Sequence, residues 1–223
     1  MPAGKQQFHI KKPFPPSGWN VNNKKGEKLA RLATNRYGCI LHRECNMAKP
    51  NVRNMLLRYR KERQKNILAK PGAHQFILVL DHLKPGFNVP KTFRSAEAFG
   101  AAAIHLVDIG PFDPAPAKGS FRKVPAVFHD DFESCFRELT KQGYQLFRLA
   151  PDADVSLCSC ELPEKSAFIL GHEEFGCSFD PAEFPTVKSL SIPQYGSVQS
   201  LNVSVASSVV MYEYVRQFQQ KTD

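Results

Sequence analysis

Hydrophobic and polar positions from residue 75 onward alternate between strand-like and helix-like stretches. Residues 75–81, Gln-Phe-Ile-Leu-Val-Leu-Asp, form a nearly continuous apolar run, which is typical of a strand buried on both faces. Further strands are predicted at 102–108, 144–149, 167–170 and 187–192, and helices at 92–100 and 131–142. This alternation predicts an α/β fold, a parallel sheet with helices on both faces, whose ligands bind beyond the carboxyl ends of the strands.

The segment after residue 200 fits two patterns. Leu201, Val203 and Val205 alternate with polar residues, as in a strand. Val205, Val209 and Tyr212 recur at helical spacing instead. The residues alone leave both interpretations open.

The first third of the chain has a different texture. Residues 1–26 are rich in Pro, Asn, Gly and Lys and are expected to be irregular, with a helix-tolerant stretch at 26–33. Residues 51–68 predict a better helix, and Pro50 suits its start. Pro71-Gly72 then breaks the chain and marks a boundary.

Positive charge is concentrated before this boundary. Residues 1–73 hold 17 Lys and Arg against 3 Asp and Glu, whereas residues 74–223 hold 13 against 18. A solvated basic face or a disordered arm would explain this, but grouped Lys and Arg also bind polyanions by releasing counterions. We therefore predict that residues 1–73 form a basic, mostly helical or irregular RNA-binding extension and that residues 74–223 form the main domain. The candidate RNA contacts are Arg58, Arg60, Lys61 and Arg63.

Several classes of protein and site have no support in the sequence. No apolar run approaches the roughly 20 residues that cross a bilayer, and the first residues lack the apolar core of a secretion signal. Six cysteines in 223 residues do not look like a disulfide framework, so free thiols in a reducing cytoplasm are expected. Neither a Gly-x-Gly-x-x-Gly turn nor a phosphate loop is present. Cys39-x-x-His42-x-x-Cys45 lacks an evident fourth zinc ligand and the histidines show no metal spacing, so no metal is predicted.

Three further stretches lie at the ends of predicted strands. The first runs from Asn88 to Arg94, with the Asn six positions before the Arg, and the second runs from Gly171 to Gly176 as Gly-His-Glu-Glu-Phe-Gly. The third, residues 192–206, contains Ser-Leu-Asn at 200–202. In this order they resemble the three signature motifs of the SpoU family of RNA ribose methyltransferases, over about residues 74–218.

The resemblance implies the SPOUT fold, whose C-terminal segment, a helix to about Phe218, threads into a trefoil knot, and it implies a homodimer. It also implies S-adenosylmethionine (AdoMet) as the cofactor and a ribose 2′-hydroxyl of tRNA or rRNA as the acceptor. A catalytically inactive RNA-binding or assembly protein, and a base methyltransferase of the same superfamily, are the alternatives. Pro90, Glu174 and Gln194 depart from the family's common residues, which bears on the substrate rather than the activity.

Roles for individual residues follow from the resemblance. Because an arginine stays protonated, Arg94 is expected to hold a phosphate and stabilise the developing alkoxide while a phosphate oxygen or water takes the proton. Asn88 would form a hydrogen bond with the ribose or hold the loop that carries Arg94. Glu173 would orient the side chain of Arg94 or that of Asn88. Ser200 and Asn202 would line the reaction centre, with an N-cap of the last helix as the alternative for Ser200. The implied cofactor cradle is Gly171, Ile192, Leu201 and Leu149.

Overall fold

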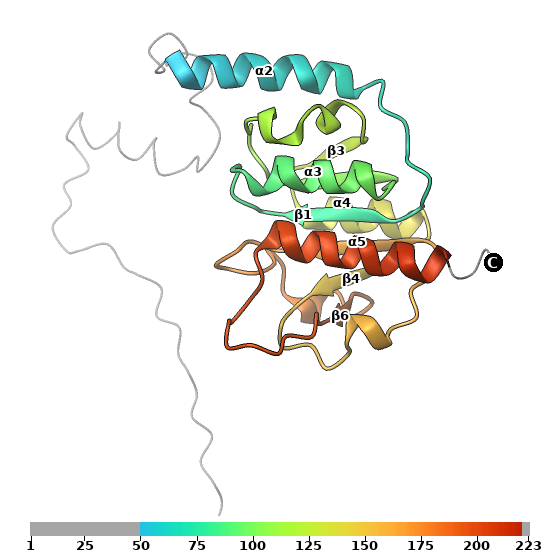
Figure 1. Ribbon diagram of the computed structural model, residues 1–223. Coiled ribbons are helices and arrows are strands. Elements are labelled where there is room, and N and C mark those ends of the chain that lie inside the picture. The colour runs from blue at the N-terminus through green and yellow to red at the C-terminus, as the bar shows by residue number, and fades with distance from the viewer. Residues whose placement is uncertain (1–49, 220–223) are drawn as a thin grey trace, which may run out of the picture. The chain divides into compact units, whose positions relative to one another are not determined.

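The computed structural model describes residues 50–219, so the predictions for residues 26–33 and for Cys39, His42 and Cys45 lie outside the described part of the chain. Within it, six parallel strands form one sheet in the order β3-β2-β1-β5-β4-β6 (Figure 1). The strands are β1 (Ile77–Asp81), β2 (Ala103–Val107), β3 (Ala126–His129), β4 (Gln145–Leu149), β5 (Ser166–Leu170) and β6 (Lys188–Leu190).

Helices cover both faces of this sheet. They are α2 (Pro50–Asn66), α3 (Asn88–Ala98), α4 (Phe132–Lys141) and α5 (Val203–Gln219). Short 3-10 turns lie in the loops at η1 (Ala115–Ala117), η2 (Ser120–Arg122), η3 (Leu157–Ser159) and η4 (Pro181–Glu183). In Figure 1, α3 and α5 lie next to each other in front of the sheet, and α4 lies behind it. Across residues 50–219, every helix falls short of the length and apolarity that a bilayer span requires.

Two hydrophobic cores result from the alternation of side chains along each strand. Leu78 and Leu80 of β1 point into the larger core, which also contains Phe93 of α3 and residues of α5. Ile77 and Val79 point into the smaller core under α4. All five residues of β1 are buried, as the apolar run predicts for a central strand of a parallel sheet.

The parallel sheet with helices on both faces is thereby confirmed, and every strand and helix predicted in this part of the chain is present. The prediction omitted β3. Its four residues form an edge strand and are only half-buried, and their apolar run, Ala126 to Phe128, is only three residues long. The trefoil knot stays a prediction.

Helix α2 packs onto the unit that holds the sheet. Tyr59 is 4% exposed and stacks on Phe121, with 5.9 Å between ring centroids. Asn66 at the end of the helix donates from Nδ2 to the carbonyl oxygen of Phe121 and accepts from the backbone N–H of Ala126 at 3.0 Å. The compact unit begins at Ala48, so α2 belongs to it. The RNA-binding role of residues 1–73 stays a prediction.

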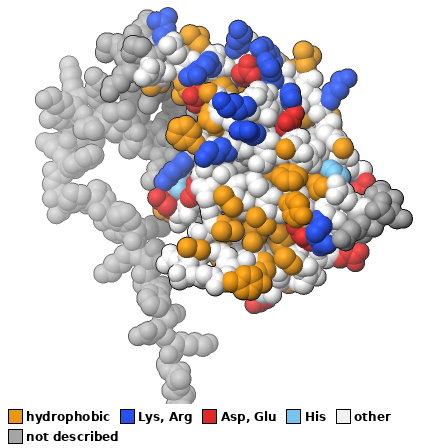
Figure 2. Space-filling model, in the orientation of Figure 1, with side chains coloured by type: hydrophobic (Ala, Val, Ile, Leu, Met, Phe, Trp, Pro, Cys, Tyr) orange, Lys and Arg blue, Asp and Glu red, His pale blue; other side chains and the backbone are white. Residues whose placement is uncertain are grey.

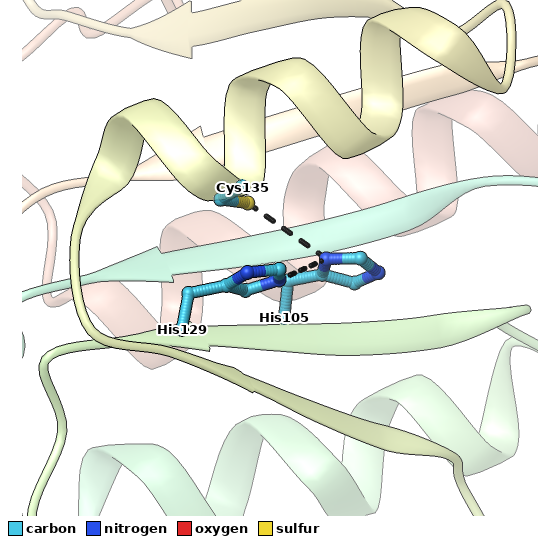
Figure 3. A group of neighbouring side chains, drawn as sticks. All are labelled: His105, His129 and Cys135. Atoms are coloured by element: carbon cyan, nitrogen blue, oxygen red, sulfur yellow. Dashed lines mark hydrogen bonds between the residues drawn. The ribbon is translucent and has the colours of Figure 1, made fainter.

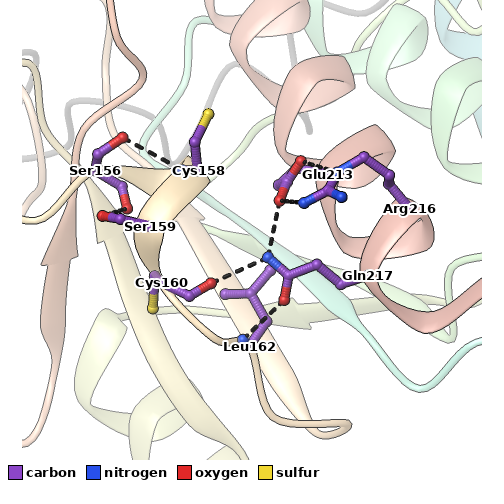
Figure 4. A network of polar contacts seen from close by, with 8 residues as sticks. All are labelled: Ser156, Cys158, Ser159, Cys160, Leu162, Glu213, Arg216 and Gln217. Carbon is purple, nitrogen blue, oxygen red and sulfur yellow. Dashed lines mark hydrogen bonds and ion pairs between the residues drawn. The ribbon is translucent and has the colours of Figure 1, made fainter. Parts of the chain in front are cut away.

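Helix α5 is fixed at its far end by the segment between β4 and β5 (Figure 4). Gln217 donates from Nε2 to the carbonyl oxygen of Cys160 and to Oε1 of Glu213, at 3.0 and 2.8 Å. The backbone N–H of Leu162 donates to Oε1 of Gln217 at 3.0 Å. Arg216 donates to both carboxylate oxygens of Glu213 and holds the pKa of that group below its usual value. These bonds set the position of α5, whose opposite end carries the third motif.

Candidate active site

The three motifs meet beyond the carboxyl ends of β1 and β5. Asn88, the first residue of α3, donates from Nδ2 to Oε1 of Glu173 at 2.8 Å. Asn202, just before α5, donates from Nδ2 to Oδ1 of Asn88 at 3.3 Å. One polar residue from each motif therefore takes part in a continuous chain of hydrogen bonds across 114 residues of sequence.

Asn202 also caps α5. Its Oδ1 accepts hydrogen bonds from the backbone N–H of Ser204 at 3.0 Å and from the Ser204 hydroxyl at 2.6 Å, which is the arrangement of a helix N-cap. Since Oδ1 is engaged by donors, Nδ2 must be the atom that faces Asn88. The cap that the sequence offered as an alternative for Ser200 thus belongs to Asn202, two residues later.

The second motif forms a tight loop after β5. His172 and Gly176 exchange two backbone hydrogen bonds, of 2.7 and 2.9 Å. A Cβ atom at Gly171 would lie 2.4 Å from the carbonyl carbon of Gly176, and Gly176 itself has φ of +72°. Both ends of the Gly-x-Glu-x-x-Gly pattern therefore require glycine, and the turn between them holds Glu173 at Asn88.

Asp81, the last residue of β1, holds this loop in place through hydrogen bonds. Its carboxylate accepts hydrogen bonds from the backbone N–H and the hydroxyl of Ser178, at 2.6 and 2.7 Å. Burial raises the pKa of Asp81, and the two hydrogen bonds oppose that shift. Sequence reasoning missed this positioning residue, whose one signal was an acid that ends an apolar strand.

Two of the departures from the family pattern have a local explanation. Pro90 is the third residue of α3, in the first turn, where the N–H that proline lacks has no partner within a helix. Glu174 pairs with Lys84 at 3.0 Å, and this hydrogen bond lowers the pKa of the exposed Glu174 carboxyl. Neither residue disturbs the bond between Asn88 and Glu173.

A pocket of about 560 Å³ opens beside the three motifs. The loops after β4, β5 and β6 and the first turn of α5 line it. All four predicted cofactor residues are among its walls, together with three of the predicted catalytic residues: Leu149, Gly171, Ile192, Leu201, Glu173, Ser200 and Asn202. Sequence reasoning did not single out Arg148, Pro151 and Asp152, which also line it.

Arg94 stands apart from this group. It lies on the exposed side of α3 and has no hydrogen bond or ion pair with any residue in the described part of the chain. Arg94 lies six positions after Asn88 on α3, which places it about 9 Å further along the helix axis. The structure therefore brings together Asn88, Glu173 and Asn202 but leaves the Arg94 guanidinium in solvent.

The predicted RNA contacts lie on the exposed surface of α2, in a region where Lys and Arg gather (Figure 2). Arg58 forms an ion pair with Asp113 at 3.4 Å, and the Arg63 guanidinium lies 4.0 Å from the centre of the Phe128 ring. Arg60 and Lys61 are exposed and make no ion pair with the residues described. These two are the residues of the set whose charges are available to a ligand.

Comparison with known proteins gives concordant results for sequence and fold. Residues 75–212 match the model of the SpoU rRNA Methylase family. The 23S rRNA (guanosine-2'-O-)-methyltransferase RlmB of Xylella fastidiosa (strain 9a5c) is 32% identical over 158 residues, which is 69% of this chain and 63% of that protein. The chain thus spans less than two thirds of the length of the curated relatives that it matches first.

Two solved structures share the fold. The structure described as "Structural insights into the 2-OH methylation of C/U34 on tRNA" has a TM-score of 0.60 and 27% identity, and the match covers 67% of this chain and 99% of that one. The SpoU methyltransferase AviRb from Streptomyces viridochromogenes in complex with AdoMet has a TM-score of 0.59 and 22% identity, over 67% of this chain and 62% of that one. By its motifs, its parallel sheet and the family match, this chain belongs to the SpoU rRNA methylase family.

Proposed function

We propose that this protein is an AdoMet-dependent RNA methyltransferase that transfers a methyl group to a ribose 2′-hydroxyl of tRNA or rRNA. The observation that carries the proposal is the chain of hydrogen bonds from Asn202 through Asn88 to Glu173, at the wall of a pocket large enough for a small cofactor. RlmB, the relative at 32% identity, is a ribose methyltransferase by name, which supports the same reaction here.

The pocket fits the chemistry of AdoMet. Leu149, Ile192 and Leu201 offer apolar side chains to a purine ring, and Gly171 exposes its backbone because it has no side chain. Oε1 of Gln194, also in the pocket wall, is buried and has no hydrogen-bond partner in the described part of the chain. An unpaired buried acceptor costs about 1–3 kcal/mol. A ligand with an amino group, such as the adenine or the methionine end of AdoMet, would satisfy it.

The chain's own residues would orient the acceptor ribose. When bound, AdoMet supplies a methyl group on a positively charged sulfur, so the protein needs no metal for this step. Both Nδ2 and Oδ1 of Asn88 are hydrogen-bonded to neighbouring side chains, and these bonds fix the orientation of the amide toward a sugar hydroxyl. Alignment of this kind can lower a barrier by several kcal/mol.

The proton of the 2′-hydroxyl must leave as the O–C bond forms. Arg94 stays protonated and so cannot accept it. Its guanidinium is free of partners among the described residues and would bind the phosphate next to the reacting ribose, where it also stabilises the developing alkoxide. A phosphate oxygen or water then takes the proton to solvent.

We further propose that the protein acts as a homodimer in the cytoplasm and that residues 1–73 hold the RNA. Apolar side chains on α3 and α5 are exposed, which supports the dimer: Phe87 at the start of α3 is 69% exposed, and Tyr212 on α5 is 59% exposed. Arg60 and Lys61 of α2 support phosphate contacts. Such contacts would position the RNA, and the loops of the site would select the nucleotide.

The direct test is to incubate the full chain with labelled AdoMet and separate pools of tRNA and rRNA, and to identify the product by nucleoside mass spectrometry. A 2′-O-methylated nucleoside is expected from one pool. A methylated base would contradict the ribose assignment. RNA binding without AdoMet binding at millimolar cofactor, measured by calorimetry, would favour the inactive RNA-binding protein instead.

A further inference from the structure

Two imidazoles and a thiol lie close together at the β3 edge of the sheet (Figure 3). His105 lies on β2, His129 ends β3 and Cys135 lies in the second turn of α4. Nδ1 of His105 is 2.9 Å from Nε2 of His129 and 3.7 Å from Sγ of Cys135. All three lie on the α4 face of the sheet, whereas the methyltransferase pocket is built on β4, β5 and β6.

We propose that His105, His129 and Cys135 bind a zinc ion. Zinc takes nitrogen and sulfur ligands at about 2.0–2.1 and 2.3 Å in tetrahedral geometry. Those bond lengths place two ligand nitrogens about 3.3 Å apart, and a nitrogen and a sulfur about 3.6 Å apart. The separations of 2.9 and 3.7 Å are within a few tenths of an ångström of these values. The third pair, Nε2 of His129 and Sγ of Cys135, lies within 4.8 Å.

Zinc binds imidazole in its neutral form and cysteine as its thiolate. Cys135 must therefore lose its thiol proton when the ion binds. Zinc binding would break the S–H bond and release that proton to solvent, leaving a net charge of +1 on the ion and its three ligands.

Nearby carboxylates would balance this charge. Glu138 follows Cys135 by three residues on α4, so the two side chains share one face of the helix. Asp131 follows His129 by two residues and is the N-cap of α4. A water molecule would complete the four ligands that zinc prefers.

A metal bound at this site would stabilise the edge strand β3. Among the strands of residues 50–219, β3 pairs only with β2, through four half-buried residues. A metal bonded to side chains of β2, β3 and α4 would tie this edge strand to its neighbour and to the covering helix. Sequence reasoning could not assemble this set, because its members come from three separate elements and show no spacing motif. The prediction that no metal binds is decided by the test below.

The test uses cobalt as a spectroscopic probe of the site. Because Cys39, His42 and Cys45 offer similar ligands, the full chain with Cys39→Ser and Cys45→Ser serves as the background protein. Titration with Co²⁺ is expected to give one equivalent bound, with a thiolate-to-cobalt charge-transfer band and the visible bands of tetrahedral cobalt. Zinc should abolish these bands, and the purified protein should contain zinc by elemental analysis.

Three variants in this background decide the assignment. Cys135→Ser should remove the charge-transfer band, and His129→Asn, at a half-exposed position, should weaken cobalt binding at least tenfold while the fold is retained. Cys158→Ser, at an exposed cysteine outside the cluster, should change neither. A background protein without the charge-transfer band, or a band that survives Cys135→Ser, would show that the two histidines only share a hydrogen bond and that no metal binds.

Discussion

At the scale of the residue, Asn202 connects stability to the chemistry of the site. Its Oδ1 caps α5 and its Nδ2 holds Asn88, so one amide satisfies the helix end and orients the motif on α3. The side chain of Asn88 passes this constraint to Glu173. A substitution that keeps the oxygen but removes the N–H group separates the two roles.

We therefore predict that Asn202→Asp folds normally but methylates poorly. Aspartate caps a helix as well as asparagine, and its charge is favourable at the N-terminus, so the free energy of unfolding should change by less than about 0.5 kcal/mol. The second carboxylate oxygen would face Oδ1 of Asn88 and should reduce kcat at least tenfold. Asn202→Ala, which loses the cap as well, should cost about 1 kcal/mol in urea unfolding. Equal activity of Asn202→Asp and wild type would remove Asn202 from the site.

Arg94 gives the second prediction at this scale. Because its guanidinium makes no hydrogen bond or ion pair with any described residue and does not line the pocket, Arg94→Ala should leave AdoMet affinity and thermal stability unchanged. Turnover should fall about 100-fold or more, as when a single donor to a developing oxyanion is lost. Single-turnover methylation and calorimetry with AdoMet measure the two effects. An active Arg94→Ala protein would contradict the role proposed for the guanidinium.

At the scale of the element, the C-terminal segment is the part whose secondary structure the residue pattern did not decide. The alternation of polar residues with Leu201, Val203 and Val205 also fits a strand, yet the chain is helical from residue 203, and Ser207 on this helix is fully buried. Ser208 bonds to Ser95 of α3 at 2.9 Å. Small polar side chains fill the contact between two helices, so polarity did not mark solvent. The resemblance to the family, and not the periodicity, predicted the helix.

The other elements also differ in how well the sequence predicts them. The central strands were predictable because parallel pairing buries both faces and so demands apolar runs. β3 was not, because its apolar run of three residues is too short to mark a strand. The loop of the second motif could be located from Gly171 and Gly176. Its anchor at Asp81 and the cap at Asn202 depend on contacts between distant segments, which no local pattern records.

Helix α2 carries the third prediction. Neutralising its free charges with Arg60→Gln and Lys61→Gln should weaken RNA binding and reduce the slope of log K against log salt by about 1.5, since each phosphate contact releases nearly one counterion. The matched control is Arg137→Gln with Lys141→Gln on α4, a helix on the opposite face of the sheet. Filter binding at several salt concentrations gives both slopes. If the α2 variant keeps the wild-type slope, the helix does not contact phosphates.

Helix α5 carries the fourth prediction, which concerns pH. Arg216 holds the pKa of Glu213 below the usual value of 4.5, so Glu213 stabilises the fold above that value, and the stabilisation disappears as the pH falls through the folded-state pKa. Glu213→Gln should therefore lose about 1 kcal/mol at pH 7, and this deficit should be smaller at pH 3, because Glu213 takes up a proton as the pH falls. Urea unfolding at the two pH values measures this. Glu183→Gln, at an exposed position on η4 with no ion pair among the described residues, is the control. An equal deficit of Glu213→Gln at both pH values would refute the ionic role.

At the scale of the whole molecule, the site lies next to a surface that one chain leaves uncovered. Val205 and Tyr212 are seven residues apart on α5, are 48% and 59% exposed, and share one side of the helix. Phe87, at 69% exposed, lies at the end of α3 that carries Asn88. Apolar side chains that gather beside a binding pocket favour a second copy of the chain as their cover.

The last prediction is that charge on this surface separates the dimer and impairs the enzyme together. Tyr212→Glu should convert a species of twice 25.1 kDa into one of 25.1 kDa, because a buried unpaired carboxylate opposes association. Val52→Glu, on α2 and 44% exposed, is the matched control and should leave the mass unchanged. Light scattering with chromatography gives the masses, and methyl transfer is assayed on the same fractions. A monomeric Tyr212→Glu protein with full activity would show that one chain holds the complete site, and a monomeric wild type at micromolar concentration would exclude the dimer itself.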